Sequence, residues 1–344
     1  MGKLNRSLLF LSVILILGIA TGCAGNGSVD RFGGEKPNVS TPHELGQNGS
    51  GISGGENVTS GNPERPGPIR VRDDFGYEVV INKTPERIVS LAPSNTEILF
   101  ALGLGDRVVG VTDYCNYPEE VKNKPKVGGY STVNIERVLA LNPDLVVAAY
   151  GNGKETVEIL REYGLTVIAL NPENLSDVMR DIELLGRATG EEENATRLVG
   201  MMEQRIGEVK KEALNLSFRP KVAHVLWHDP IWVSGRDTFI DELIEIAGGE
   251  NAFHDLEGWK IVSIEDFLAR NPDIIVVNSG TGMGGSKDIL YEWAVRELGD
   301  VKAVREGRVY VIDADVISRP SYRLVYALEE LSEIISEFSS SKSG

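Results

Sequence analysis

Two glutamates, Glu136 and Glu265, occupy the same position in two similar stretches of the sequence. The first stretch covers residues 134–147, the second covers residues 263–276, and the two align without gaps. Each reads as a capped helix, an Asn-Pro-Asp turn and a β-branched strand, with the glutamate in the first helical turn. A carboxylate there stabilises the helix dipole by about 0.3–1 kcal/mol. Two matched carboxylates could also bind arginines of a partner that has twofold pseudo-symmetry.

Three histidines and one cysteine are the other candidates for chemistry after residue 68: His224, His228, His254 and Cys115. A transition-metal receptor needs about three imidazoles and a carboxylate that converge. His224 lies inside an apolar strand pattern and is expected in the core, and Cys115 is expected to be a packed thiol. After residue 68, neither H-E-x-x-H nor G-x-S-x-G occurs. We therefore expect no catalytic residue, no metal site, no cofactor and no enzyme activity.

The elements that position these residues follow an alternating pattern. Short apolar runs alternate with helical patterns over residues 69–175 and again over 219–341, which predicts parallel sheets in two lobes. Residues 176–218 show helical spacing with a break near Gly190. The second half of this segment, 191–214, predicts one helix roughly 35 Å long. The expected fold class is α/β, with two similar Rossmann-like lobes, mostly parallel sheets, and one long bridging α-helix.

The N-terminal segment reads as a targeting signal. Residues 1–23 have a positive start, a short apolar run and the sequence Ala-Thr-Gly before Cys23, which resembles a lipobox with a lipidated cysteine. A plain secretory signal is the alternative. Residues 24–68 are rich in Gly, Ser and Asn and predict a disordered tether. The net charge of −16 disfavours binding to nucleic acid. We expect a lipid-anchored protein on the extracytoplasmic face of the cell membrane.

Further distinctive sequence lies in the segments 87–97, 109–118, 127–130 and 233–251. Together with the two stretches that contain Glu136 and Glu265, these segments resemble the iron-siderophore and cobalamin receptor family of ABC importers. The similar region runs from about Arg87 to Leu331, most of the part expected to fold. In that family two α/β lobes are bridged by one long helix, and the two glutamates bind arginines of the membrane subunits. The resemblance therefore assigns permease docking to Glu136 and Glu265.

The resemblance also implies a ligand site lined by aromatic side chains. Family members that bind vitamin B12 hold the flat corrin in an aromatic cleft. Tyrosine and tryptophan offer large rigid faces with one polar edge, which suits a corrin, a haem or a catecholate. We expect the equivalent residues to lie just beyond strand ends or in loops, facing the ligand. They are Tyr114, Tyr130, Tyr150, Trp232 and Trp259.

The resemblance predicts a receptor that delivers cobalamin or a related metal chelate to an ABC permease. A ferric-siderophore or haem receptor of the same family is the alternative, followed by a direct metal-ion receptor or a secreted hydrolase. Ferric catecholates are anionic and need cationic partners. Candidates for that role near the second lobe are Arg236, Lys260, Arg319 and Arg323.

The lipid anchor can be tested directly. We expect the Cys23→Ser variant to leave the membrane fraction, because the serine hydroxyl cannot form the thioether. Cell fractionation followed by immunoblotting measures this. Retention of the variant in the membrane at the wild-type level would contradict the lipidation of Cys23.

Overall fold

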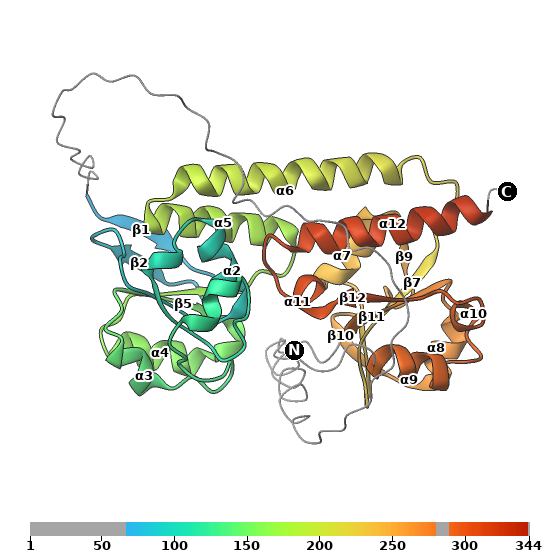
Figure 1. Cartoon of the computed structure of the whole chain (residues 1–344), viewed down its shortest axis with the longest axis horizontal. Coiled ribbons are helices and arrows are strands. Elements are labelled where there is room, and N and C mark those ends of the chain that lie inside the picture. The colour runs from blue at the N-terminus through green and yellow to red at the C-terminus, as the bar shows by residue number, and fades with distance from the viewer. Residues whose placement is uncertain (1–66, 280–288, 343–344) are drawn as a thin grey trace, which may run out of the picture.

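The computed structural model describes residues 67–279 and 289–342. These residues form two α/β lobes side by side, with helix α6 running along one side of both (Figure 1). The predicted signal peptide, Cys23 and nearly all of the predicted tether lie outside the described residues. Within the described residues, no helix is both long and apolar enough to cross a membrane.

The first lobe is built on a four-stranded parallel sheet with the order β4-β3-β5-β6. Every residue of β5 is buried, as expected for a parallel strand covered on both faces. An antiparallel ribbon of β1 and β2 lies beside this sheet. The elements are β1 (Ile69–Arg72), β2 (Glu78–Ile81), β3 (Ile88–Ser90), α2 (Pro93–Ala101), η2 (Gly105–Arg107), β4 (Val108–Val111), η3 (Glu119–Asn123), α3 (Ile135–Ala140), β5 (Leu145–Ala149), η4 (Tyr150–Asn152), α4 (Lys154–Glu162) and β6 (Val167–Leu170).

Two helices connect the lobes, α5 (Leu175–Thr189) and α6 (Glu192–Ala213). Gly190 separates them and has a φ of 83°, a left-handed conformation that glycine adopts without strain. The predicted break near Gly190 and the predicted long helix over residues 191–214 are therefore confirmed. In Figure 1, α6 extends from above the first lobe to above the second, where it lies along α12 (Leu324–Lys342).

The second lobe contains a mixed sheet with the order β10-β8-β7-β11-β12. Strands β7, β11 and β12 are parallel, whereas β8 is antiparallel to both of its neighbours. The sequence pattern does not reveal β8 and β10, because no helix separates β7 from β8 or β9 from β10 and the alternation of strand and helix is therefore missing there. The elements are β7 (Lys221–His228), β8 (Ile231–Ser234), α7 (Phe239–Ile246), β9 (Glu250–Asn251), β10 (Trp259–Val262), α8 (Ile264–Arg270), β11 (Ile274–Ser279), α9 (Ile289–Glu297), α10 (Lys302–Arg305), β12 (Val309–Asp313), α11 (Ala314–Ile317) and α12.

One hydrophobic cluster, which we call the shared core, extends through both lobes. It joins Leu99 of α2, Leu185 of α5, Met202 of α6, Val276 of β11 and Leu328 of α12. Smaller clusters fill the opposite face of each sheet. The lobes therefore do not hinge about a bare linker, because moving one against the other would disturb packed side chains.

The two similar stretches of sequence adopt the same local structure. The N-caps Asn134 and Ser263 each accept a hydrogen bond from the backbone three residues on, as predicted. Asn142 and Asn271, which follow the two helices, have left-handed φ values of 47° and 45°. Asparagine tolerates this conformation better than most residues.

The aspartates that follow these asparagines attach each stretch to the neighbouring strand. Asp144 accepts hydrogen bonds from the backbone of Glu86 and Arg87, just before β3. Asp273 accepts one from the backbone of Lys221, the first residue of β7. Asp144 comes just before β5, which pairs with β3, and Asp273 comes just before β11, which pairs with β7. Each aspartate therefore helps to hold the corresponding pair of strands in register.

His224 is a satisfied core residue, as predicted. It is fully buried in β7, with Nδ1 2.9 Å from the hydroxyl of Ser234 and Nε2 2.9 Å from Oδ1 of Asn278. An amide oxygen can only accept, so Nε2 carries the proton and Nδ1 accepts from Ser234. Burial lowers the pKa of His224 to about 4, although the bond to Asn278 acts in the opposite direction. The neutral ring therefore joins three strands of the sheet.

Acid should lower the stability of the folded protein through His224. Between pH about 6.5 and about 4 the unfolded chain binds a proton at His224 that the folded chain does not, so stability falls as the pH falls through this window. The full effect is about 3 kcal/mol. We expect a His224→Gln variant to lose less stability than wild type between pH 7 and 4, measured by urea unfolding. Equal losses in the two proteins would contradict this assignment.

Candidate functional site

Three tyrosines predicted to contact ligand gather in neighbouring loops of the first lobe. Tyr114 follows β4, Tyr150 follows β5, and Tyr130 lies in the loop before α3. All three side chains are half-buried. The carboxyl ends of parallel strands meet at one edge of a sheet, which is where ligands of α/β proteins bind. The structure therefore brings these three predicted residues together.

Tyr130 is held in place by the turn after β5. Its ring lies so close to Gly151 that a Cβ there would be 2.1 Å from the ring, and its hydroxyl accepts a hydrogen bond from the backbone N–H of Gly151 at 3.3 Å. The Asn152 amide donates to the carbonyls of Tyr130 and Leu91 at 2.7 and 2.8 Å. Burial raises the pKa of Tyr130 to about 12, so the phenol stays neutral. Tyr150 makes an edge contact with Phe75, with ring centroids 6.3 Å apart.

The two predicted tryptophans lie inside strands, so the expectation that all five residues lie beyond strand ends or in loops is wrong for them. Trp232 is the second residue of β8 and is 3% exposed. Its indole Nε1 has no hydrogen-bond partner among residues 67–279 and 289–342. Trp259 begins β10 and contacts Phe239 edge-on at 5.8 Å. The error arose because β8 and β10 were read as loops.

An aromatic stack that the sequence pattern does not reveal lies at the carboxyl end of β7. The His228 ring lies between Trp227, at 4.9 Å, and Trp293 of α9, at 5.9 Å, and both pairs are nearly parallel. Burial lowers the pKa of His228, so its imidazole is neutral at neutral pH. The adjacent Trp-His pair at a strand end was the available signal, but Trp293 is distant in sequence.

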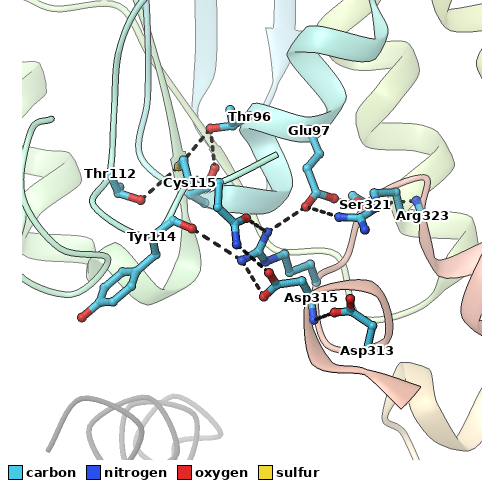
Figure 2. Close-up of polar contacts among 12 residues, drawn as sticks. Thr96, Glu97, Thr112, Tyr114, Cys115, Asp313, Asp315, Ser321 and Arg323 are labelled. Carbon is cyan, nitrogen blue, oxygen red and sulfur yellow. Dashed lines mark hydrogen bonds and ion pairs between the residues drawn. The ribbon is translucent and has the colours of Figure 1, made fainter. Parts of the chain in front are cut away.

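A group of buried charges, which we call the Glu97 cluster, connects the two lobes (Figure 2). Glu97 of α2 has a fully buried side chain. Its Oε1 accepts hydrogen bonds from Arg319 at 3.0 Å and Arg323 at 3.1 Å, and its Oε2 accepts one from the Ser321 hydroxyl at 2.5 Å. Arg319 also forms an ion pair with Asp315 at 2.6 Å. The first lobe supplies Glu97 and the second lobe supplies the other four residues.

The loop after β4 belongs to the same cluster. Arg319 donates to the side chain of Asn116 at 2.7 Å and to the carbonyl of Tyr114 at 3.5 Å. Asn116 in turn donates to Asp315 at 2.7 Å. In Figure 2 the Tyr114 ring points away from these contacts. Cys115, the next residue, is buried beside the hydroxyls of Thr96 and Thr112, and burial raises its pKa, which confirms a packed thiol.

The charges of the Glu97 cluster compensate one another. Burial raises the pKa of Glu97, while Arg323, Arg319 and the Ser321 hydroxyl favour the ionised form. Two of the four cations proposed for an anionic ligand therefore bind a carboxylate of the protein. The other two, Arg236 and Lys260, lie elsewhere in the second lobe. Arg236 is exposed, and its Nε is 3.7 Å from Oδ2 of Asp237.

Glu136 and Glu265 both lie exposed in the first turn of their helices, α3 and α8. Neither carboxylate forms a hydrogen bond or ion pair with another described residue. In Figure 1, α3 and α8 lie in different lobes, on the side opposite α6. Both carboxylates are therefore available to a partner on that side.

An acidic cavity of about 320 Å³ lies between the start of α5 and α7, and none of the three tyrosines lines it. Five carboxylates line it, which makes it unsuitable for a flat apolar chelate: Glu173, Asp237, Asp241, Glu242 and Glu245. Beside it, the ligand atoms of Asp241, Glu245 and His254 lie within 4.8 Å of one another. The His254 imidazole is 3.1 Å from Asp241, and this hydrogen bond raises the pKa of the imidazole, so contacts within the protein account for this group.

Comparison with known proteins agrees with this architecture. Residues 88–316 match the family described as periplasmic binding protein. An ABC transporter substrate-binding lipoprotein of Bacillus subtilis is 36% identical over 275 residues, which cover 78% of this chain and 85% of the relative. A vitamin B12-binding protein of Vibrio cholerae is 30% identical over 249 residues, covering 72% of this chain and 87% of that protein.

A solved structure extends the similarity to the fold. The periplasmic heme-binding protein of a Roseiflexus species, in its apo form, superimposes with a TM-score of 0.67 at 30% identity. The match covers 74% of this chain and 99% of the Roseiflexus protein. The same fold therefore occurs in a protein described as heme-binding.

Proposed function

This chain belongs to the periplasmic binding protein family and is a substrate-binding protein of the ABC-transporter type, and we propose that it captures a flat metal chelate between its lobes. Cobalamin is the ligand we favour, and haem is the second candidate. The ligand leaves unaltered and passes to the membrane permease. The observation that carries this proposal is the gathering of Tyr114, Tyr130 and Tyr150 in neighbouring loops of the first lobe.

The proposed site has an aromatic wall on each side. The three tyrosines form the wall in the first lobe, and Trp232 and Trp259 belong to the wall in the second. Tyrosine and tryptophan rings bury large apolar area at low cost in conformational entropy.

The arrangement of charge favours a macrocycle over an anionic siderophore. Arg319 and Arg323 are neutralised by Glu97 and are buried against the first lobe. A ferric catecholate, with several negative charges, would need such cations directed toward it. Cobalamin needs fewer of them. The similarity to a vitamin B12-binding protein and to a heme-binding protein supports the same class of ligand.

We also propose that the protein is attached to the extracytoplasmic face of the cell membrane through a lipid on Cys23. A relative that is 36% identical carries the name lipoprotein. A tether of the predicted composition would let the lobes reach the permease while they remain anchored.

The ligand site can be tested at Tyr114, whose ring makes none of the cluster contacts. We expect Tyr114→Ala to weaken cyanocobalamin binding roughly 30- to 150-fold, because burying about 100 Å² of aromatic surface contributes about 2–3 kcal/mol. Quenching of tryptophan fluorescence measures the affinity, and haemin and a ferric catecholate are tested in parallel. Tyr163→Ala, which removes an exposed tyrosine of the same lobe, should bind as wild type. Wild-type affinity of Tyr114→Ala for every probe would refute the site.

Docking can be tested by charge reversal. We expect the Glu136→Lys, Glu265→Lys double variant to lose delivery to the permease while its ligand affinity stays within a few-fold of wild type, because both carboxylates are exposed. Transport into proteoliposomes that contain the permease measures delivery. A matched control reverses Glu155 of α4 and Glu292 of α9, which are also exposed and also lie in a first helical turn. Equal loss of transport in the two double variants would argue against docking through Glu136 and Glu265.

A further inference from the structure

We propose that the Glu97 cluster is a latch that holds the two lobes at the separation needed for ligand binding before the ligand arrives. The contacts of Glu97 with Arg319, Ser321 and Arg323 all cross from one lobe to the other. Its effect on ligand affinity rests on the function proposed above, whereas its effect on the lobes does not.

The latch is attached to the first lobe at two places. One is α2, through Glu97. The other is the loop after β4, where Arg319 contacts the side chain of Asn116 and the carbonyl of Tyr114. On the second lobe, every partner lies in α11 or in the segment between α11 and α12. Arg319 therefore couples the position of the Tyr114 loop to the second lobe and acts as a positioning residue.

Burial makes these contacts hard to break. The Glu97 side chain is fully buried, and those of Arg319 and Arg323 are 10% and 13% exposed. A displacement of the lobes too small to admit water would leave this carboxylate buried without its partners, which is strongly unfavourable. The guanidinium of Arg323 also lies over the Tyr117 ring, 4.1 Å from its centroid, which adds a cation–π contact across the lobes.

The cluster is complete without a ligand. Glu97 and Asp315 supply two negative charges, and Arg319 and Arg323 supply two positive ones. Because these charges cancel, the cluster has no unpaired positive charge for an anionic ligand to balance. The cluster therefore serves to position the lobes, and binding energy need not be spent on bringing them together.

The separation of the lobes can be measured in the ligand-free protein. Spin labels are attached through Glu162→Cys on α4 and Glu297→Cys on α9, both exposed, in a Cys23→Ser background in which Cys115 stays buried. Double electron–electron resonance then gives the distribution of distances between the lobes. We expect one narrow distribution for the wild-type cluster and a broader one for Glu97→Gln.

A milder variant and a matched control complete this experiment. Arg319→Lys keeps the charge but loses the planar fork that reaches Glu97, Asn116 and Tyr114 together, so it should also broaden the distribution. If circular dichroism shows that Glu97→Gln does not fold, Arg319→Lys is measured in its place. Glu329→Gln breaks an Arg-Glu pair of 2.8 Å between α6 and α12 and should leave the distribution narrow. Narrow distributions in Glu97→Gln and Arg319→Lys, or equal broadening in Glu329→Gln, would overturn the latch.

Ligand binding separates this proposal from the function on which it partly rests. If breaking the latch leaves about one-tenth of the molecules correctly arranged, cyanocobalamin or haemin should bind roughly tenfold more weakly to Arg319→Lys. Unchanged affinity together with a broadened distribution would refute preorganisation by the latch. If no probe binds the wild-type protein but the distributions differ as expected, the latch stands and the proposed function fails.

Discussion

The burial of one carboxylate, that of Glu97, constrains how the two lobes lie against each other. A charge inside a protein must be paired, and the partners of Glu97 are supplied by the other lobe. The loop that carries Tyr114 is drawn into the same set of contacts through Arg319. The position of a proposed ligand contact in one lobe thus depends on an arginine of the other.

The packing of the shared core also constrains how the two lobes lie against each other. Met202 of α6 lies in one continuous cluster with Leu99 of the first lobe and Leu328 of the second. Polar contacts fix direction and distance, whereas close packing resists compression and sliding. The long helix alone would allow some rocking of the lobes, but the helix, the shared core and the ionic contacts together define a single arrangement.

The sequence predicted those parts of the fold that have a local signal. The helix over residues 191–214 shows apolar residues at helical spacing, and β5 is a continuous apolar run. Asn134 and Ser263 were recognisable as caps because capping depends on neighbouring residues. Strands β8 and β10 are paired antiparallel and no helix directly precedes either of them, so they lack the alternation of strand and helix that marks the parallel strands.

The residues of the candidate site also differ in whether the sequence could predict their positions. The family resemblance implied all five aromatic residues, and the expected loop position holds for the three tyrosines, whereas Trp232 and Trp259 lie inside strands that the sequence pattern does not reveal. The Glu97 cluster could not be predicted, because Arg319 lies 222 positions from Glu97. No local pattern marks a pair so distant, and Arg319 and Arg323 looked like cations available to a ligand. Their true partner is visible only when both lobes are in place.

The continuity of the shared core also bears on how the protein unfolds. One face of each central sheet is covered by residues of this common cluster, which includes side chains of α5, α6 and α12. If one lobe melts, the other loses the cover of one sheet face and exposes it to water. The two lobes are therefore two units of architecture but one unit of thermodynamic cooperativity, and a defect in either lowers the stability of the whole.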